Sequence, residues 1–236
     1  MRDDDMYDIL KNWPYEQGKL NARMIEGQDG RPLIQIRIEL GVIQMEVVGR
    51  PDGVLQEGYL TLLALFEDRG TSDGIDEEMC RRLREEGVQR SHRSAALFAI
   101  GKWGAVIEDC DKNLELFNLC RDYAREQIDR KALEQFRASV IAMRARAGAE
   151  WAIEEGVPSK AVEAVNQGLY ELKEALGEAW ESSNEVHLLR GMKEALVPQL
   201  PPSERADLRE RLLAAISAEN YELAAILRDE LRLLRD

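Results

Sequence analysis

The side chains best suited to catalysis or metal binding are few and poorly spaced in this sequence. The two histidines, His92 and His187, stand in no HxxxH or HExxH pattern. The residues three places before them are Gln89 and Asn184, so the Glu-x-x-His pairs of a dinuclear metal site are absent. No GxSxG, Walker A or GxGxxG sequence occurs. We expect a non-enzymatic protein with no catalytic, cofactor or metal site, and an uncharacterised enzyme stays the alternative.

The three cysteines, Cys80, Cys110 and Cys120, contain no CxxC pair. This spacing favours reduced, mostly structural thiols over a zinc ribbon. The first residues lead into no apolar run, and no window approaches the about 18 apolar residues of a membrane span. We therefore expect a cytoplasmic protein without a signal peptide or a membrane helix.

The charge balance limits the classes of partner. The 236 residues include 32 Lys and Arg against 45 Asp and Glu, which gives a formal net charge of −13. A chain this acidic is repelled by a phosphate backbone. Short basic runs such as Arg81-Arg82 are followed at once by Glu85 and Glu86. We expect no direct binding to nucleic acid, so any link to DNA repair would run through another protein.

The chain after Pro202 has the pattern of two antiparallel helices, with Ser203 and Asn220 as their predicted N-caps. The second helix has two apolar stripes, and Glu230 interrupts one of them. A hairpin that is apolar on two sides cannot bury both against itself, so something else must cover the second. The stripes are Leu208, Leu212 and Ile216 on the first helix, Tyr221, Ala224, Leu227, Leu231 and Leu234 facing it, and Leu223, Ile226 and Leu233 on the other side.

The string ENYELAAILRD, from Glu219 to Asp229, closely resembles the UVR motif, in which an acidic-aromatic-Glu turn precedes paired alanines and Leu-Arg-Asp. That motif occurs in UvrB, in UvrC and in some regulators of bacterial Clp ATPases, where it docks proteins. The resemblance implies a bacterial adaptor, with the UvrB–UvrC excision machinery or a Clp-type ATPase as candidate partners. The protein-binding residues that it implies are Tyr221, Leu223, Ala224, Ala225, Ile226, Leu227, Arg228 and Asp229.

The sequence leaves open what covers the second stripe. The hairpin packs on its own protein, or a UVR element of a partner completes a four-helix arrangement, or the hairpin of a second copy does so in a structural homodimer. Arg228 and Asp229 are either a solvated charge pair or a contact with the partner.

In the N-terminal third, turn-forming residues separate three segments with the pattern of strands. This predicts a three-stranded antiparallel β-meander, with strands near Lys19–Glu26, Arg31–Glu39 and Ile43–Gly49. A four-residue turn, Glu39 to Val42, is preferred over a tight Leu40-Gly41 turn that gives the same register but needs Leu40 at positive φ. The segment Val54–Asp68 is the expected cover of the apolar face. The polar face is either solvated or a recognition surface. The predicted pairs are Ile38 with Ile43, Ile36 with Met45, and Ile34 with Val47.

The middle of the chain has two degenerate units in which a helix ends at a glycine, Gly101 or Gly156, and a second helix opens. These units weakly resemble tetratricopeptide repeats. Their glycines, Gly101 and Gly156, stand 55 residues apart, so an extra helix over about Asn118–Arg130 is expected between them. The alternatives for this region are plain helical packing and a peptide-binding concavity.

The predicted fold is therefore α+β and predominantly helical. Its parts are a β-meander with a covering helix over residues 1–72, a TPR-like helical bundle over 73–197, and a proline-rich linker with a UVR helical hairpin over 198–236. The predicted function is protein–protein interaction through the hairpin.

Overall fold

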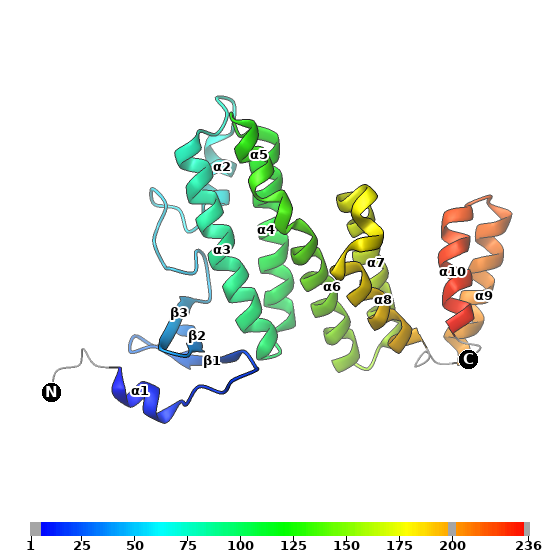
Figure 1. Cartoon of the computed structure of the whole chain (residues 1–236), viewed down its shortest axis with the longest axis horizontal. Coiled ribbons are helices and arrows are strands. Elements are labelled where there is room, and N and C mark those ends of the chain that lie inside the picture. The colour runs from blue at the N-terminus through cyan, green and yellow to red at the C-terminus, as the bar shows by residue number, and fades with distance from the viewer. Residues whose placement is uncertain (1–5, 198–201, 234–236) are drawn as a thin grey trace. The chain divides into compact units, whose positions relative to one another are not determined.

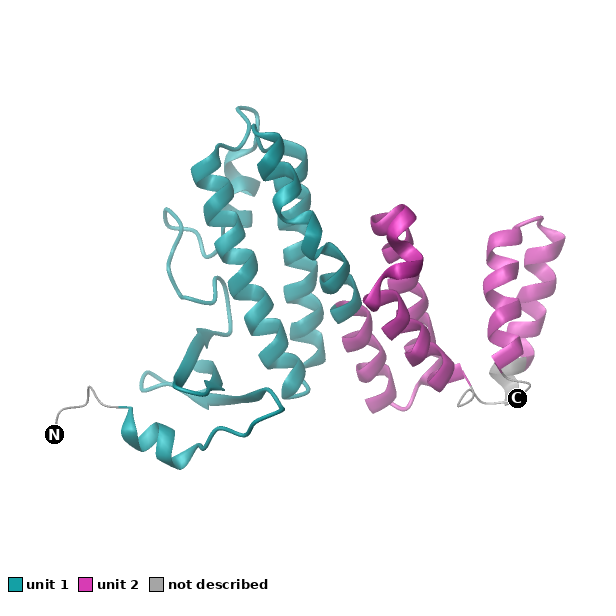
Figure 2. Cartoon of the chain, viewed as in Figure 1, with its two compact units in different colours: residues 1–143 teal, residues 144–236 magenta. Residues whose placement is uncertain are grey.

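A computed structural model describes residues 6–197 and 202–233 of the protein (Figure 1). The chain divides into two compact units, Met1–Met143 and Arg144–Asp236 (Figure 2). The described part is predominantly helical and contains a small three-stranded antiparallel sheet, which confirms the predicted α+β class. The predicted division into three domains, with boundaries after residues 72 and 197, stays a prediction, because it states which segments fold independently.

The first unit holds the sheet and the first five α-helices (Figure 1). Its strands are β1 (Asn21–Glu26), β2 (Pro32–Ile38) and β3 (Gly41–Glu46). Its helices are α1 (Tyr7–Asn12), α2 (Leu62–Arg69), α3 (Glu77–Ala99), α4 (Trp103–Tyr123) and α5 (Gln127–Ala132), followed by the 3-10 turn Glu134–Phe136. Among the described residues, no helix has the length and apolar character that crossing a membrane requires.

The strand order β1-β2-β3 is as predicted, but the register between β2 and β3 differs. Ile38 pairs with Gly41, so the turn consists of Glu39 and Leu40, and neither of these residues has a positive φ. The predicted four-residue turn is therefore wrong, and the pairing is displaced by two residues. Because side chains alternate with a period of two, this displacement leaves every side chain on its predicted face.

Helix α3 is the cover of the sheet. On β2, Ile34 and Ile36 are 0% and 5% exposed, and α3 contacts both β1 and β2. The segment that was expected to cover the sheet, Val54–Asp68, contributes α2, which contacts α4. A three-stranded sheet with one apolar face needs a helix against it, and the longer α3 supplies that surface.

The polar face of the sheet is partly covered as well. Gln35 is 4% exposed, accepts two hydrogen bonds from the Arg23 guanidinium at 2.9 and 2.8 Å, and donates one to Gln44 at 2.8 Å. Arg37 donates to the Trp13 carbonyl at 2.9 Å, and the Arg23 guanidinium lies 4.0 Å from the centroid of the Trp13 ring. The segment before β1 covers the β2 part of this face, whereas Gln44 of β3 stays exposed, so the expectation of a solvated face holds only in part.

Both predicted helix–Gly–helix connections are present. Helix α3 leads into α4 through Gly101, at φ +69°, and α6 (Arg137–Glu154) leads into α7 (Pro158–Leu176) through Gly156, at φ +73°. A glycine ends a helix in this left-handed conformation without the steric cost of a Cβ. The resemblance to tetratricopeptide repeats is not tested further by these connections and stays a prediction.

An extra helix does lie between the two units, but the predicted bounds Asn118–Arg130 are wrong. Helix α4 continues to Tyr123, and the break falls at Ala124, whose backbone is extended and forms a bridge with Ile75. This bridge stops α4 because the Ile75 N–H bonds to the Tyr123 carbonyl at 2.8 Å. The short α5 then begins at Gln127.

In the second unit, α7 is followed by the 3-10 turn Gly177–Ser182, α8 (Asn184–Leu196), α9 (Pro202–Ser217) and α10 (Tyr221–Leu233). Small residues allow α6 and α7 to approach closely. A Cβ added at Gly168 of α7 would lie 2.4 Å from the Ala145 Cβ of α6 and 3.0 Å from Leu189 Cδ1 of α8. Such distances are far below normal carbon contact, so the absence of a side chain at residue 168 permits this packing.

The three cysteines are buried, on α3 and α4, and none of them forms a disulfide. Burial raises the pKa of Cys80 to about 11 and that of Cys120 to about 12. A thiol with so high a pKa is almost wholly protonated at neutral pH and is a poor nucleophile. The position of these thiols agrees with the packing role predicted for them.

Candidate protein-docking hairpin

Helices α9 and α10 form an antiparallel pair joined by residues 218–220 (Figure 1). Asn220 is the predicted N-cap of α10, and its Oδ1 accepts a hydrogen bond from the Leu223 N–H at 3.1 Å. Helix α9 begins at Pro202, so Ser203 lies inside its first turn and not before it. The side chain of Ser203, the whole of Leu234 and the predicted linker over 198–201 lie outside the described residues.

The interior of the hairpin is built from small and branched apolar side chains. Ala224 and Leu227 of α10 are 8% and 2% exposed, and Leu208 and Ala215 of α9 are 6% and 4% exposed. The alanines let the two backbones approach closely. Tyr221 was predicted to lie on this interior stripe, but it is 68% exposed, because it stands at the first residue of α10, where the stripe ends.

The second side of α10 contacts helices of the same unit through its charged residues. Glu230 is 2% exposed, and its carboxylate lies 2.9 Å from the Lys193 ammonium of α8. The same carboxylate accepts a hydrogen bond from the Asn166 amide of α7 at 2.6 Å. Glu222 pairs with Lys173 of α7 at 2.5 Å, and this hydrogen bond holds the pKa of Glu222 below its ordinary value.

These pairs define how α10 lies on α7. Asn166 and Lys173 are two turns apart on one face of α7, and they meet Glu230 and Glu222 in the reverse order. Helix α10 therefore runs antiparallel to α7. The chain's own helix supplies part of the cover for the second stripe, which is the first of the three arrangements that the sequence left open.

That cover is incomplete. A cleft of about 570 Å³ remains between α7, α9 and α10, and its lining includes Leu223 and Ile226 of α10 and Val162 of α7. Leu223 and Ile226 are still 38% and 39% exposed. The apolar contact between the hairpin and α7 is thus partial, and the polar pairs at residues 222 and 230 add to it.

A second set of apolar side chains stands near the connection between the two helices. Leu213 and Ile216, in the last two turns of α9, are 65% and 49% exposed, and Tyr221, at the start of α10, is 68% exposed.

Arg228 and Asp229 are exposed and form an ion pair with each other at 2.9 Å, which agrees with the solvated charge pair that the sequence allowed. An exposed pair of this kind contributes little stability, so both side chains stay available to a partner.

The eight residues predicted to bind a partner therefore fall into two groups. Ala224 and Leu227 are buried inside the hairpin, and Ala225 is half-buried. The exposed members are Tyr221, Leu223, Ile226, Arg228 and Asp229. The first group shapes the hairpin, and only the second group presents side chains on its surface.

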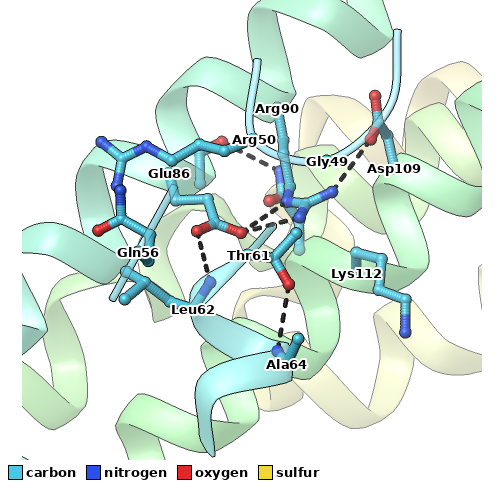
Figure 3. A network of polar contacts seen from close by, with 12 residues as sticks. Gly49, Arg50, Gln56, Thr61, Leu62, Ala64, Glu86, Arg90, Asp109 and Lys112 are labelled. Atoms are coloured by element: carbon cyan, nitrogen blue, oxygen red, sulfur yellow. Dashed lines mark hydrogen bonds and ion pairs between the residues drawn. The ribbon is translucent and has the colours of Figure 1, made fainter. Parts of the chain in front are cut away.

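A buried ionic network in the first unit is the other concentration of polar side chains (Figure 3). Glu86, Arg90 and Arg93 of α3 and Asp109 of α4 are each at most 4% exposed. Arg93 donates to both carboxylate oxygens of Asp109, at 2.8 and 2.6 Å. Arg90 donates to Glu86 at 2.8 Å and reaches Asp109 at 3.3 Å. The two positive and two negative charges cancel.

This network joins elements that are distant in sequence. Glu86 accepts a hydrogen bond from the N–H of Leu62, the first residue of α2, at 3.0 Å (Figure 3). Arg93 donates to the carbonyls of Glu46 and Gly49, each at 2.9 Å, and so holds the end of β3. A cavity of about 400 Å³ lies beside the network, but the guanidinium groups that line it are already paired with carboxylates. The arrangement fits a structural clamp.

The sequence analysis did not single out this network, although α3 carries a signal for it. The buried positions of α3 follow the alternating three- and four-residue spacing of a core-facing stripe, and Arg90 occupies one of them. An arginine at a core position requires a buried carboxylate, so this spacing predicts one. The stripe is Cys80, Leu83, Gly87, Arg90, Ser94 and Leu97.

The two histidines belong neither to the hairpin nor to the buried ionic network. His92 on α3 and His187 on α8 are both exposed. Within residues 6–197 and 202–233, no three His, Cys, Asp or Glu side chains are grouped in a way that would hold a metal ion.

Comparison with known proteins places the hairpin in a family. Residues 203–236 match the family model described as the UvrB/uvrC motif, UVR. No curated protein and no solved structure matches the chain. The match covers α9 and α10 and none of the helices and strands that precede them. The C-terminal hairpin is a UVR motif, a helical protein-interaction element of the kind carried by UvrB, UvrC and Clp-associated proteins.

Proposed function

We propose that this protein is a non-enzymatic adaptor that docks a partner protein through its UVR hairpin. The observation that carries the proposal is that Leu213, Ile216 and Tyr221 stay 49–68% exposed at one end of a hairpin that matches a protein-interaction family. Apolar and aromatic side chains that a protein leaves exposed beside charged ones are typical of binding surfaces.

The proposed partner is a protein and not a nucleic acid. The chain carries a net charge of −13, which opposes binding to a phosphate backbone. The exposed Arg228–Asp229 pair offers one charge of each sign beside the apolar residues, which suits a mixed polar rim on another protein. UvrB, UvrC and Clp-type ATPases are the candidate partners, in a bacterial cytoplasm.

A substitution at Tyr221 tests the proposal. Truncation of an aromatic anchor at the centre of an interface costs about 2 kcal/mol of binding free energy, or about thirtyfold in affinity. We expect Tyr221→Ala to lose a protein that the intact chain captures from a bacterial lysate, while the circular dichroism spectrum stays unchanged. Ala224 is unsuitable for this test, because it is buried inside the hairpin and a charge there would unfold it.

Tyr170→Ala is the matched control, since Tyr170 is 56% exposed on α7 of the same unit. It should capture the partner as the intact chain does. Equal capture by all three proteins would contradict docking through the hairpin. Light scattering of the same samples separates the alternative: a structural homodimer would halve in mass with Tyr221→Ala and capture no foreign protein.

A further inference from the structure

We propose that the hairpin is held closed against α7 and α8 by a latch, defined as Glu230 with its two partners Lys193 and Asn166, and that release of this latch exposes the Leu223–Ile226 side for docking. The role of this release in docking rests on the proposed function. The closed arrangement itself is carried by contacts within the second unit.

The first argument is the position of Glu230 in an otherwise apolar stripe. Leu223, Ile226 and Leu233 occupy the neighbouring positions of the same side of α10. An apolar residue at position 230 would bind α7 and α8 permanently, whereas a carboxylate must be stripped of water to enter the contact. Its ion pair with Lys193, whose side chain is 13% exposed, repays that desolvation only when the hairpin is closed.

The second argument is the weakness of the remaining contact. The cleft of about 570 Å³ leaves Leu223 and Ile226 more than a third exposed in the closed hairpin. The other link to α7, between Lys173 and Glu222, has side chains that are 53% and 66% exposed. An ion pair this exposed contributes little. The closed state therefore depends mainly on the latch, and a partner that binds the Leu223–Ile226 side more tightly can displace α7.

The test uses thiol labelling of the full chain carrying Leu223→Cys. The native cysteines give a low background, because all three are buried and the pKa values of Cys80 and Cys120 are raised. A cysteine at 223 is partly exposed in the closed hairpin, and its labelling rate rises when this side of α10 leaves α7. Leu213→Cys, on the exposed side of α9, reports whether the hairpin itself stays folded.

Three variants are compared in the Leu223→Cys chain. Glu230→Gln removes the latch charge from α10, and Lys193→Met removes its partner from α8. Asp229→Asn removes an adjacent carboxylate that is exposed and pairs with Arg228 of the same helix. We expect labelling to accelerate about twofold in the first two, because residue 223 is already 38% exposed in the closed hairpin, and to stay unchanged in the third.

Equal labelling rates in all variants would overturn the latch. If Glu230→Gln also accelerates labelling at Leu213→Cys, the hairpin has loosened, and Lys193→Met then decides, because residue 193 lies outside the hairpin. The result is separable from the docking test. Faster labelling of the latch variants without any captured partner would support the latch and contradict the proposed function. A partner that is captured by the intact chain and lost in Tyr221→Ala, together with equal labelling rates in all latch variants, would support the proposed function and contradict the latch.

Discussion

At the scale of single residues, the first unit depends on charges that are buried and mutually neutralised. Each arginine of the network has a carboxylate within hydrogen-bond distance, and Arg93 also satisfies two backbone carbonyls at the end of β3. A buried pair of this kind adds little stability compared with apolar residues of the same volume, but its loss leaves an uncompensated charge inside the protein. The network therefore fixes which segments meet.

The variant Asp109→Asn tests this interpretation. It keeps the shape of the side chain but leaves the network with one excess positive charge, so the free energy of unfolding should fall by about 3 kcal/mol. Urea denaturation followed by circular dichroism measures this change. Asp122→Asn on the same helix is the control, because Asp122 pairs with Arg121 at the surface, and it should alter the free energy by less than about 1 kcal/mol. Equal effects of the two variants would contradict a clamp.

At the scale of elements, the second unit depends on how closely its helices approach. Gly168 and Ala145 meet where α7 crosses α6, and Leu189 of α8 approaches the same point. Small residues at a crossing bring the helix axes together and let larger side chains interlock around them. Gly191 of α8 is a contrast, since a Cβ added there meets no atom within 4 Å.

Two glycine-to-alanine variants should therefore have opposite effects on thermal stability. Gly168→Ala forces a Cβ into contacts of 2.4 and 3.0 Å, and overpacking of this kind costs about 1–3 kcal/mol. Gly191→Ala reduces the freedom of the unfolded chain inside a helix and should stabilise by about 0.5–1 kcal/mol. Scanning calorimetry compares the two Tm values with that of the unsubstituted chain, and a Tm of Gly191→Ala below that of the unsubstituted chain would contradict the argument.

At the scale of the whole molecule, the acidic balance of the chain decides which partners it can meet. The 45 acidic residues exceed the 32 basic ones, and many of the basic side chains are already paired with carboxylates, including Arg90 and Arg93 inside the first unit. The excess of acidic over basic residues opposes binding to a phosphate backbone, although the UVR motif is associated with repair proteins. Any action on DNA would then require the docked partner.

A fluorescence anisotropy titration of labelled duplex DNA checks this expectation. Nonspecific binders reach Kd values of about 10⁻⁴–10⁻⁶ M, and their binding strengthens as salt is lowered. We expect no change in anisotropy up to about 100 μM protein even at about 50 mM salt. Binding that saturates and weakens with added salt would contradict the prediction, and a basic DNA-binding domain in the same buffer is the positive control.

The fold could be predicted from local patterns where one period dominates. Alternation at Ile34 and Ile36 placed the apolar face of the sheet, and Gly101 and Gly156 placed two helix connections. The same alternation could not fix the β2–β3 register, because a displacement of two residues preserves both faces. The true turn, at Glu39 and Leu40, carries no glycine signal.

The sequence by itself determined the C-terminal hairpin and its resemblance to the UVR motif, and residues 203–236 match the model of that family. It also showed that one side of α10 needed a cover. Only the tertiary structure decided that α7 and α8 provide part of it, through Glu230, and that Arg90 is paired inside the first unit. The physical reason is the same in both cases: a buried charge is defined by its partner, and these partners lie on other helices.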